Sequence, residues 1–131
     1  MIPQSITKTN DLNGNTADCN TERARKALDK GIVVVVSAGN EGSSSWKFLT
    51  PPSDAEGVIA VGSVTSSGTL SGFSSKGPTL DNRIKPDVVA LGSGVSVIKA
   101  SGSTGTTSGT SVASSRSWQV WLQASFRHIR T

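Results

Sequence analysis

Five consecutive β-branched residues, Ile32 to Val36 (IVVVV), constrain the fold of this chain more than any other stretch. A continuous apolar run of this length predicts a strand that is buried on both faces, as in a parallel sheet. The preceding residues 21–30 (TERARKALDK) have the composition of a short helix, and Gly31 can cap its carboxyl end. A helix, a glycine and a buried strand in this order predict one half-unit of an α/β fold.

Three further stretches have the pattern of strands. Residues 57–64 (GVIAVGSV) read as a second buried strand, and residues 85–92 (KPDVVALG) and 94–100 (GVSVIKA) supply one or two more. The segments between them have the composition of loops and turns. We therefore expect an α/β protein of three layers, in which IVVVV and GVIAVGSV are neighbouring parallel strands. With 131 residues and 34% hydrophobic content, the chain suffices for one domain with a thin core.

Composition and charge argue against several classes of function. The net charge of +4 is modest, and the basic residues are scattered without interleaved aromatic residues, so we expect no nucleic-acid partner. No apolar stretch approaches the ~18 residues that span a membrane, so we expect no membrane partner. The single cysteine, Cys19, excludes an intramolecular disulfide and a cysteine-rich metal site. No acidic cluster has calcium-ligand spacing, so neither a metal site nor a cofactor is evident.

Two short motifs are candidates for chemistry. SAGNEG (residues 37–42) directly follows IVVVV and places Asn40 at the carboxyl end of a parallel strand, where α/β folds form their sites. The Asn40 amide can donate a hydrogen bond to a developing oxyanion, although asparagine and glycine are also ordinary turn residues. SGTSVAS (residues 108–114) places Ser111 at the expected start of a helix, where unpaired amides and the helix dipole favour negative charge. The other interpretation of this stretch is a flexible linker.

Five segments together resemble one family. KGIVVVVSAGNEG, SDAEGVIAVGSV, FSSKGP, KPDVVALG and SGTSVAS occur in the order and spacing of the subtilisin-like serine proteases, the subtilases, over about residues 20–114. The resemblance implies an endopeptidase that hydrolyses peptide or protein substrates through an acyl-enzyme on Ser111. It also implies that Asn40 is the side-chain donor of the oxyanion hole, and that Ala38, Gly39 and Asn40 line part of the substrate pocket.

The resemblance carries three further implications. The family commonly has a cis peptide bond at the position of Pro51-Pro52. Its members often bind Ca²⁺, although no such site is readable in this sequence. They are mostly secreted or extracytoplasmic, whereas the first fifteen residues here show no export-signal pattern.

The sequence does not contain the family motifs that carry the aspartate and the histidine of the catalytic triad. A subtilase triad runs Asp, His, Ser along the chain, but the 36 residues before SAGNEG contain no histidine. Asp11, Asp18 and Asp29 match none of the family's aspartate motifs. We therefore expect a partial subtilisin-like fold without its N-terminal half, in which residues 1–19 form a loose leading segment and residues 20–114 the partial catalytic domain. Because a serine without a base is a weak nucleophile, we expect this chain alone to be inactive.

The sequence also departs from the family after Ser114. The family continues with a helix similar to PVVAGLAAL, whereas this chain reads SRSWQVWLQAS. Suitable codons for residues 115–124, read two bases later, encode Pro-Val-Val-Ala-Gly-Leu-Ala-Ala, which resembles the family's helix. This match predicts a frameshift just after Ser114. Residues 115–131 would then be an atypical tail. The alternative is a genuine terminal helix, because Trp118, Trp121 and the apolar residues after them recur at helical spacing.

Two other functions stay open. A partial fold exposes a sheet edge, through which a non-catalytic α/β module could bind a partner or self-associate. Alternatively, His128 could be the base of a minimal esterase. If residues 111–128 are helical, however, about 25 Å separates His128 from Ser111, whereas a base must lie within about 3 Å of its nucleophile.

Overall fold

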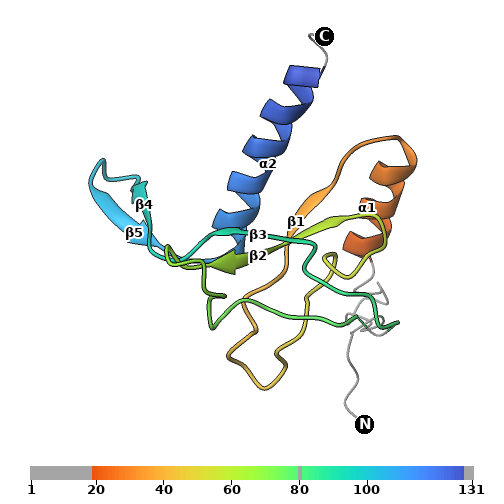
Figure 1. Ribbon diagram of the computed structural model, residues 1–131, viewed down its shortest axis with the longest axis horizontal. Coiled ribbons are helices and arrows are strands. Elements are labelled where there is room, and N and C mark those ends of the chain that lie inside the picture. Colours follow the sequence, from red (N-terminus) through yellow and green to blue (C-terminus); the bar gives the residue numbers. More distant parts are fainter. Residues whose placement is uncertain (1–18, 80, 129–131) are drawn as a thin grey trace.

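The computed structural model describes residues 19–79 and 81–128, which form an α/β fold (Figure 1). The elements are, in order, α1 (Cys19–Asp29), β1 (Val35–Ser37), β2 (Ile59–Val64), β3 (Val88–Leu91), β4 (Val95–Ile98), β5 (Thr104–Thr107) and α2 (Thr110–His128). The expected helix, both neighbouring strands and the strand in KPDVVALG are thus present.

Three parallel strands form the sheet, in the order β1-β2-β3. Val35 pairs with Ile59, and Val61 pairs with Val88. The central strand, β2, is buried over its four inner residues, because it has a neighbour on each side. The prediction that IVVVV and GVIAVGSV lie side by side as parallel strands is confirmed.

Gly31 ends α1 as the sequence predicts. It has a φ of 75°, which favours glycine, and its N–H donates to the Leu28 carbonyl at 2.8 Å. The Ile32 N–H donates to the Ala27 carbonyl at 3.0 Å. This pair of hydrogen bonds is the Schellman motif, which satisfies the last carbonyls of the helix and directs the chain toward β1.

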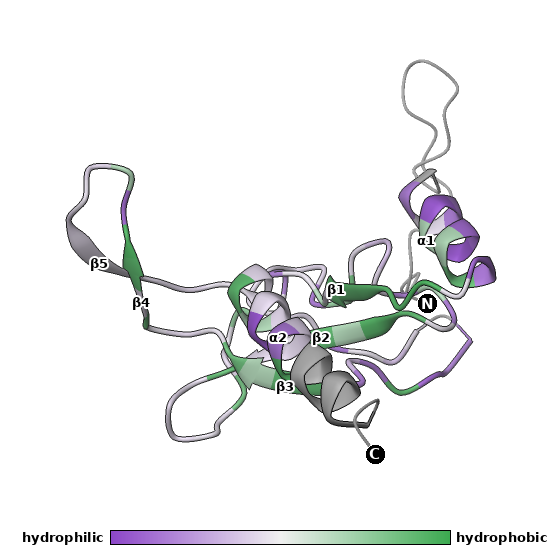
Figure 2. Cartoon of the chain, turned by 90° about the horizontal axis from the view of Figure 1, so that it is seen from above, coloured by the Kyte–Doolittle hydropathy of each residue, from purple (hydrophilic) through white to green (hydrophobic). Residues whose placement is uncertain are grey.

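Helix α2 packs against one face of the sheet, and α1 lies toward the other face at one end of the strands. Ala24 of α1 belongs to a cluster with Val34 and Val36, whereas Val35 and Ile59 line a hollow that α2 borders. Since successive strand residues point to opposite faces, α1 and α2 lie on different sides. Figure 2 shows α2 across the strands and α1 near one end of them. The expected layering of an α/β fold is therefore present.

The extent and burial of the first strand differ from the prediction. Only Val35–Ser37 are in β1, its residues are half-buried, and Ile32 is 57% exposed. The expectation of a strand buried on both faces over residues 32–36 is wrong, because among the described residues β1 pairs only with β2. An apolar run predicts a strand, but its burial depends on a second neighbour.

The segment 94–100 does not join the parallel sheet. Its strand, β4, pairs antiparallel with β5, with Val95 opposite Thr107 and Ile98 opposite Thr104. Gly94, with a φ of 68°, lies in the bend between β3 and β4, and its N–H donates to Ser108 Oγ at 2.9 Å. The hairpin extends away from the sheet in Figures 1 and 2. Residues 104–107, directly before the motif SGTSVAS, are therefore a strand.

Helix α2 continues without interruption through the divergent tail to His128. The terminal helix considered from the sequence is thus present, while the frameshift stays a prediction about the nucleotide sequence. The Pro51-Pro52 bond is cis, as the family resemblance implies. Within residues 19–79 and 81–128, no helix is both long and apolar enough to cross a membrane.

Candidate active site

Asn40 is positioned by a tight turn at the carboxyl end of β1. The Ala38 N–H still donates to the Val61 carbonyl at 2.9 Å, and Gly39 then turns the chain with a φ of 109°. A Cβ on Gly39 would lie 2.6 Å from Thr50 Oγ1 and 2.9 Å from Ser75 Oγ. Glycine is therefore required here on two grounds, and the turn brings Asn40 out of the sheet to an exposed position.

Ser111 lies in the first turn of α2, at the carboxyl end of β3. The Gly109 N–H donates to the Gly92 carbonyl at 2.7 Å, which ties the start of α2 to the end of β3. A Cβ on Gly92 would lie 2.6 Å from the Gly109 carbonyl oxygen, so the two segments approach as closely as glycines allow. Ser111 itself is exposed. The motif SGTSVAS is thus the start of a helix and not a linker.

Asn40 is hydrogen-bonded to Thr110, the residue before Ser111, at the carboxyl end of the sheet. The Thr110 backbone N–H and the Thr110 hydroxyl both donate to Asn40 Oδ1, each at 2.9 Å. A Cβ on Gly109 would lie 3.9 Å from both Asn40 Nδ2 and the Ser111 backbone nitrogen. The Asn40 side-chain nitrogen and the Ser111 backbone nitrogen, both hydrogen-bond donors, are therefore both near the Cβ position of Gly109. The predicted placement of both residues at one end of the sheet is confirmed, and their catalytic roles stay predictions.

Thr110 is a site residue that sequence reasoning missed. It is 1% exposed, and its hydroxyl also accepts a hydrogen bond from the Gly39 N–H at 3.3 Å. The only signal for it in the sequence is its place between Gly109 and Ser111. Nothing in that spacing shows that its side chain turns inward while Ser111 stays exposed.

Ser75 fixes the backbone on either side of Asn40. Its N–H donates to the Gly39 carbonyl at 2.9 Å, and its hydroxyl accepts from the Glu41 N–H at 3.0 Å. Ser75 is completely buried. The loop that follows Asn40 is thus held by a neutral hydroxyl that lies 34 residues further along the chain.

The three residues assigned to the substrate pocket differ in exposure. Ala38 is completely buried, and its carbonyl accepts from the Thr50 N–H at 3.2 Å and from Ser53 Oγ at 3.3 Å. Gly39 is half-buried, whereas Asn40 is exposed. Of the three, Asn40 is therefore the one most open to a bound molecule. That they line a substrate pocket stays a prediction.

No described contact gives Ser111 a general base. Two neighbouring hydroxyls, from Ser114 and Ser115, donate to its backbone carbonyl at 2.9 Å and 3.0 Å. His128, the only histidine of the sequence, lies at the opposite end of α2, about 25 Å away along the helix. The structure therefore does not bring Ser111 and His128 together within one chain. Among the described residues, no group of three His, Cys, Asp or Glu could hold a metal ion.

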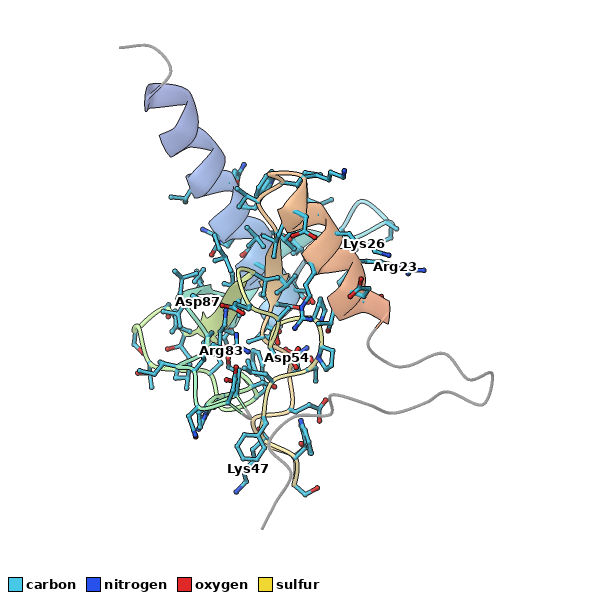
Figure 3. The ribbon with its side chains drawn as sticks, turned by 90° about the vertical axis from the view of Figure 1, so that its right-hand side faces the viewer. Arg23, Lys26, Lys47, Asp54, Arg83 and Asp87 are labelled. Carbon is cyan, nitrogen blue, oxygen red and sulfur yellow. The ribbon has the colours of Figure 1, made fainter. Side chains whose placement is uncertain are left out.

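Ionised groups gather instead around the amino ends of β2 and β3. Lys85 Nζ donates to Asp87 Oδ2 at 2.6 Å and to the Val58 carbonyl at 2.8 Å, and its side chain is only 5% exposed. Arg83 donates to the Asp54 carbonyl at 2.8 Å (both residues are labelled in Figure 3), and Arg83, Lys85 and Asp87 line the same hollow. These charges tie the two strands together at the end of the sheet away from Asn40.

Arg83 also perturbs an exposed carboxylate. Its Nε donates to Asp81 Oδ2 at 2.7 Å, and the Thr79 hydroxyl donates to Asp81 Oδ1. These two hydrogen bonds, chiefly the one from Arg83, lower the pKa of Asp81 from 3.8 to about 2. The same pair raises the pKa of Arg83. Arg23 and Lys26, by contrast, are exposed on α1 and point away from the molecule in Figure 3.

Comparisons with known proteins agree with this arrangement. A model of the subtilase family matches residues 2–116. Subtilisin E of Bacillus subtilis is 42% identical over 89 residues, which cover 67% of this chain and 22% of that protein. Serine protease AprX of the same organism is 40% identical over 74 residues, which cover 51% of this chain and 16% of that protein.

A solved structure shows the same fold. The self-cleaved protease domain of PatA has a TM-score of 0.60 and 28% identity, covering 72% of this chain and 33% of that domain. The chain spans about a fifth of the length of the curated relatives named above. Since the family model extends over most of the sequence, and since the structure places its motifs around one parallel sheet, the chain belongs to the subtilase family.

Proposed function

We propose that this chain contributes the nucleophile and part of the oxyanion hole of a subtilisin-like serine endopeptidase. Ser111 is the nucleophile, and Asn40 Nδ2 with the Ser111 N–H are the donors to the oxyanion. The observation that carries the proposal is that Asn40 Nδ2 and the Ser111 backbone nitrogen each lie 3.9 Å from a Cβ built on Gly109. This position is at the carboxyl end of a parallel sheet.

In the proposed reaction, Ser111 Oγ attacks the carbonyl carbon of a peptide bond and gives up its proton to a base. The carbonyl oxygen becomes negatively charged as the tetrahedral intermediate forms. Asn40 Nδ2 and the Ser111 N–H donate to that oxygen, and the positive end of the α2 dipole also favours the charge. Loss of one such donor lowers kcat by about 10²–10³, a figure measured in subtilisin, which is itself a relative.

Among residues 19–79 and 81–128, no histidine lies within reach of Ser111 to act as the base of this mechanism. The only histidine is at the far end of α2. Removing the histidine of the triad lowers turnover by about 10⁶, again in subtilisin. We therefore infer that the chain alone hydrolyses peptides extremely slowly, and that activity requires an aspartate and a histidine from a further polypeptide segment.

A fluorophosphonate that modifies activated serines tests this proposal. The chain alone should react slowly or not at all. A subtilase segment that bears the Asp and His motifs, added in trans, should accelerate labelling of Ser111, and Ser111→Ala should abolish it. If the complemented chain folds, as judged by circular dichroism, and Ser111 still does not react, the proposed role of Ser111 is wrong.

His128→Ala is the matched control for the minimal esterase. Fast labelling of Ser111 in the isolated chain that disappears in His128→Ala would assign the base to the tail. Labelling that is equally slow in both proteins supports a base from outside the chain.

The exposed strands favour a second candidate function, a non-catalytic module that binds a partner. Among the described residues β3 pairs only with β2, and Val88 and Val89 are 44% and 52% exposed. An apolar hollow of about 540 Å³ lies between β3 and α2, with Val120 on its wall. Sedimentation velocity distinguishes the candidates, because a concentration-dependent dimer that Val89→Lys abolishes would support association through this edge.

A further inference from the structure

The β4–β5 hairpin leads directly into α2, yet it stands apart from the rest of the fold. Among the described helices and strands, the extensive contacts of β4 and β5 are with each other. The hairpin extends away from the sheet in Figures 1 and 2, and its residues 101–104 are exposed. Because a two-stranded ribbon without further packing is marginally stable, we expect the hairpin to move more than the sheet.

Ser108 lies at the boundary between this hairpin and the candidate active site. It is exposed, whereas the next two residues, Gly109 and Thr110, are buried. These three residues separate Thr107, the last residue of β5, from Ser111. A movement of the hairpin backbone would therefore reach Ser111 unless a contact at this boundary stops it.

Two hydrogen bonds close the base of the hairpin at the boundary, just beyond the end of the strand ladder. The Gly94 N–H donates to Ser108 Oγ at 2.9 Å, and the Gly109 N–H donates to the Gly92 carbonyl at 2.7 Å. The second bond joins backbone groups, whereas the first depends on the side chain at position 108. One bond alone would leave the two segments free to rotate about it, so the second point of attachment fixes their relative orientation.

We propose that Ser108 is a positioning residue that clamps the base of the β4–β5 hairpin and so keeps Ser111 fixed while the hairpin moves. Ser108 acts through the backbone of Gly109 and Thr110, because its hydroxyl bonds to Gly94 and not to a reacting group. The inference rests on the proposed function for its significance in catalysis, since Ser111 is the proposed nucleophile. The clamp itself is a property of the folded chain and is measurable without activity.

Backbone ¹⁵N relaxation of the full chain tests the clamp directly. In the wild type, the order parameters of residues 109–111 should exceed those of the hairpin amides, with the rise at Ser108. In Ser108→Ala the values for residues 109–111 should fall toward those of the hairpin. Hydrogen exchange of the Gly94 amide should accelerate roughly fivefold in this variant, the factor that one net hydrogen bond supplies. Ser108→Thr keeps a hydroxyl and should restore both values.

Ser101→Ala is the matched control for Ser108→Ala. It removes an exposed hydroxyl that is hydrogen-bonded to Ser103 at 2.9 Å, at the opposite end of the same hairpin. The order parameters of residues 109–111 should stay at their wild-type values in this control. Equal falls in the two variants, or no fall in folded Ser108→Ala, would overturn the proposal. If Ser108→Ala does not fold, the wild type decides, because order parameters that do not rise between Thr107 and Gly109 contradict a clamp.

Labelling of Ser111 by the fluorophosphonate in the complemented chain connects the clamp with catalysis. Ser108→Ala should slow the labelling severalfold, and Ser108→Thr should restore it. The pH midpoint of labelling should not change, because Ser108 is not the base. Labelling of Ser108→Ala at the wild-type rate, with lowered order parameters, would refute the positioning role. A complemented wild-type chain that does not react would refute the proposed role of Ser111, whereas the order parameters would still decide whether the clamp exists.

Discussion

The two ends of the parallel sheet are built from different chemistry. At the carboxyl end, the groups that hold Asn40 are neutral: the Thr110 and Ser75 hydroxyls and backbone amides. At the amino end, Lys85 and Asp87 form an ion pair whose cation is buried and which bonds to the backbone of β2 and of the residue before it. The hydrogen bonds described at the carboxyl end are between neutral groups, whereas those at the amino end include an ion pair.

This difference fits the proposed chemistry of the carboxyl end. A fixed charge near Ser111 would bias the site before any reaction, whereas oriented neutral dipoles stabilise charge only where it develops. The amino end carries no such requirement, so ion pairs can fix the register of β2 and β3 there. The ion pair thus lies at one end of the three strands, and the proposed oxyanion stabilisation lies at the other.

The largest loss of stability should come from removing the cation of the ion pair between Lys85 and Asp87. Lys85→Met leaves the Asp87 carboxylate and the Val58 carbonyl without their cation, and we expect the free energy of unfolding to fall by about 3 kcal/mol. This is the lower part of the range for a buried pair, because the Asp87 side chain is 37% exposed. Urea denaturation measures the change.

Lys26→Met is the control for Lys85→Met. Lys26 pairs with Glu22 at 3.8 Å on the surface of α1, with both side chains more than half exposed. Its removal should change the free energy of unfolding by about 0.5 kcal/mol or less. Equal losses in the two variants would show that the amino-end pair does not act as a buried ion pair.

The neutral end should be most sensitive to added volume. A Cβ on Gly42 would overlap the carbonyl oxygen of Ser74 and would lie 2.7 Å from that of Gly72, and neither is a flexible side chain. We expect Gly42→Ala to lower the free energy of unfolding by about 2–3 kcal/mol. Gly72→Ala is the matched control in the same region, because its Cβ would meet only Ser43 Oγ at 3.9 Å. Similar thermal denaturation of both variants would refute the packing argument.

Much of the fold could be predicted because its determinants are local. Val35 and Val61 lie in apolar runs that indicate parallel strands, and Gly31 directly follows a helical segment. The apolar pattern was therefore sufficient to predict the strands, and the glycine to predict the end of the helix. Asn40 and Ser111 could be placed at one end of the sheet because family motifs put Asn40 directly after a strand and Ser111 at the start of a helix. Nothing in either case required knowledge of a distant side chain.

The remainder depends on contacts between distant segments. Thr110 bonds to a residue 70 positions earlier, and no periodicity in the sequence encodes that pairing. The burial of Ile32 depends on whether a second strand lies beside β1, which the apolar run itself cannot specify. The departure of β4 from the sheet depends on its pairing with β5, a partner that the pattern of residues 94–100 does not identify.

A smaller effect at the neutral end should follow loss of one buried hydroxyl. Ser75→Ala removes the acceptor of the Glu41 N–H, and we expect the free energy of unfolding to fall by about 1 kcal/mol. The control is Ser67→Ala, which removes an exposed hydroxyl bonded to Thr65 and should have an effect near zero. Hydrogen exchange of the Glu41 amide should accelerate in Ser75→Ala alone, and unchanged exchange would show that the hydroxyl does not hold this backbone.

The smallest effect concerns acid stability near the charged end. The pKa of Asp81 in the folded chain is about 2, below the ordinary value of 3.8, so its ionised form stabilises the folded state. This contribution is fully present above about pH 4 and is lost as the pH falls toward about 2, because the unfolded chain then binds the proton first. The free energy of unfolding of Asp81→Asn should therefore fall less steeply than that of the wild type across this window. Asp29→Asn, which removes an exposed carboxylate at the end of α1, is the control. A wild-type slope in Asp81→Asn would show that the Arg83 and Thr79 hydrogen bonds do not persist in solution, and the charged end would then depend on Lys85 and Asp87.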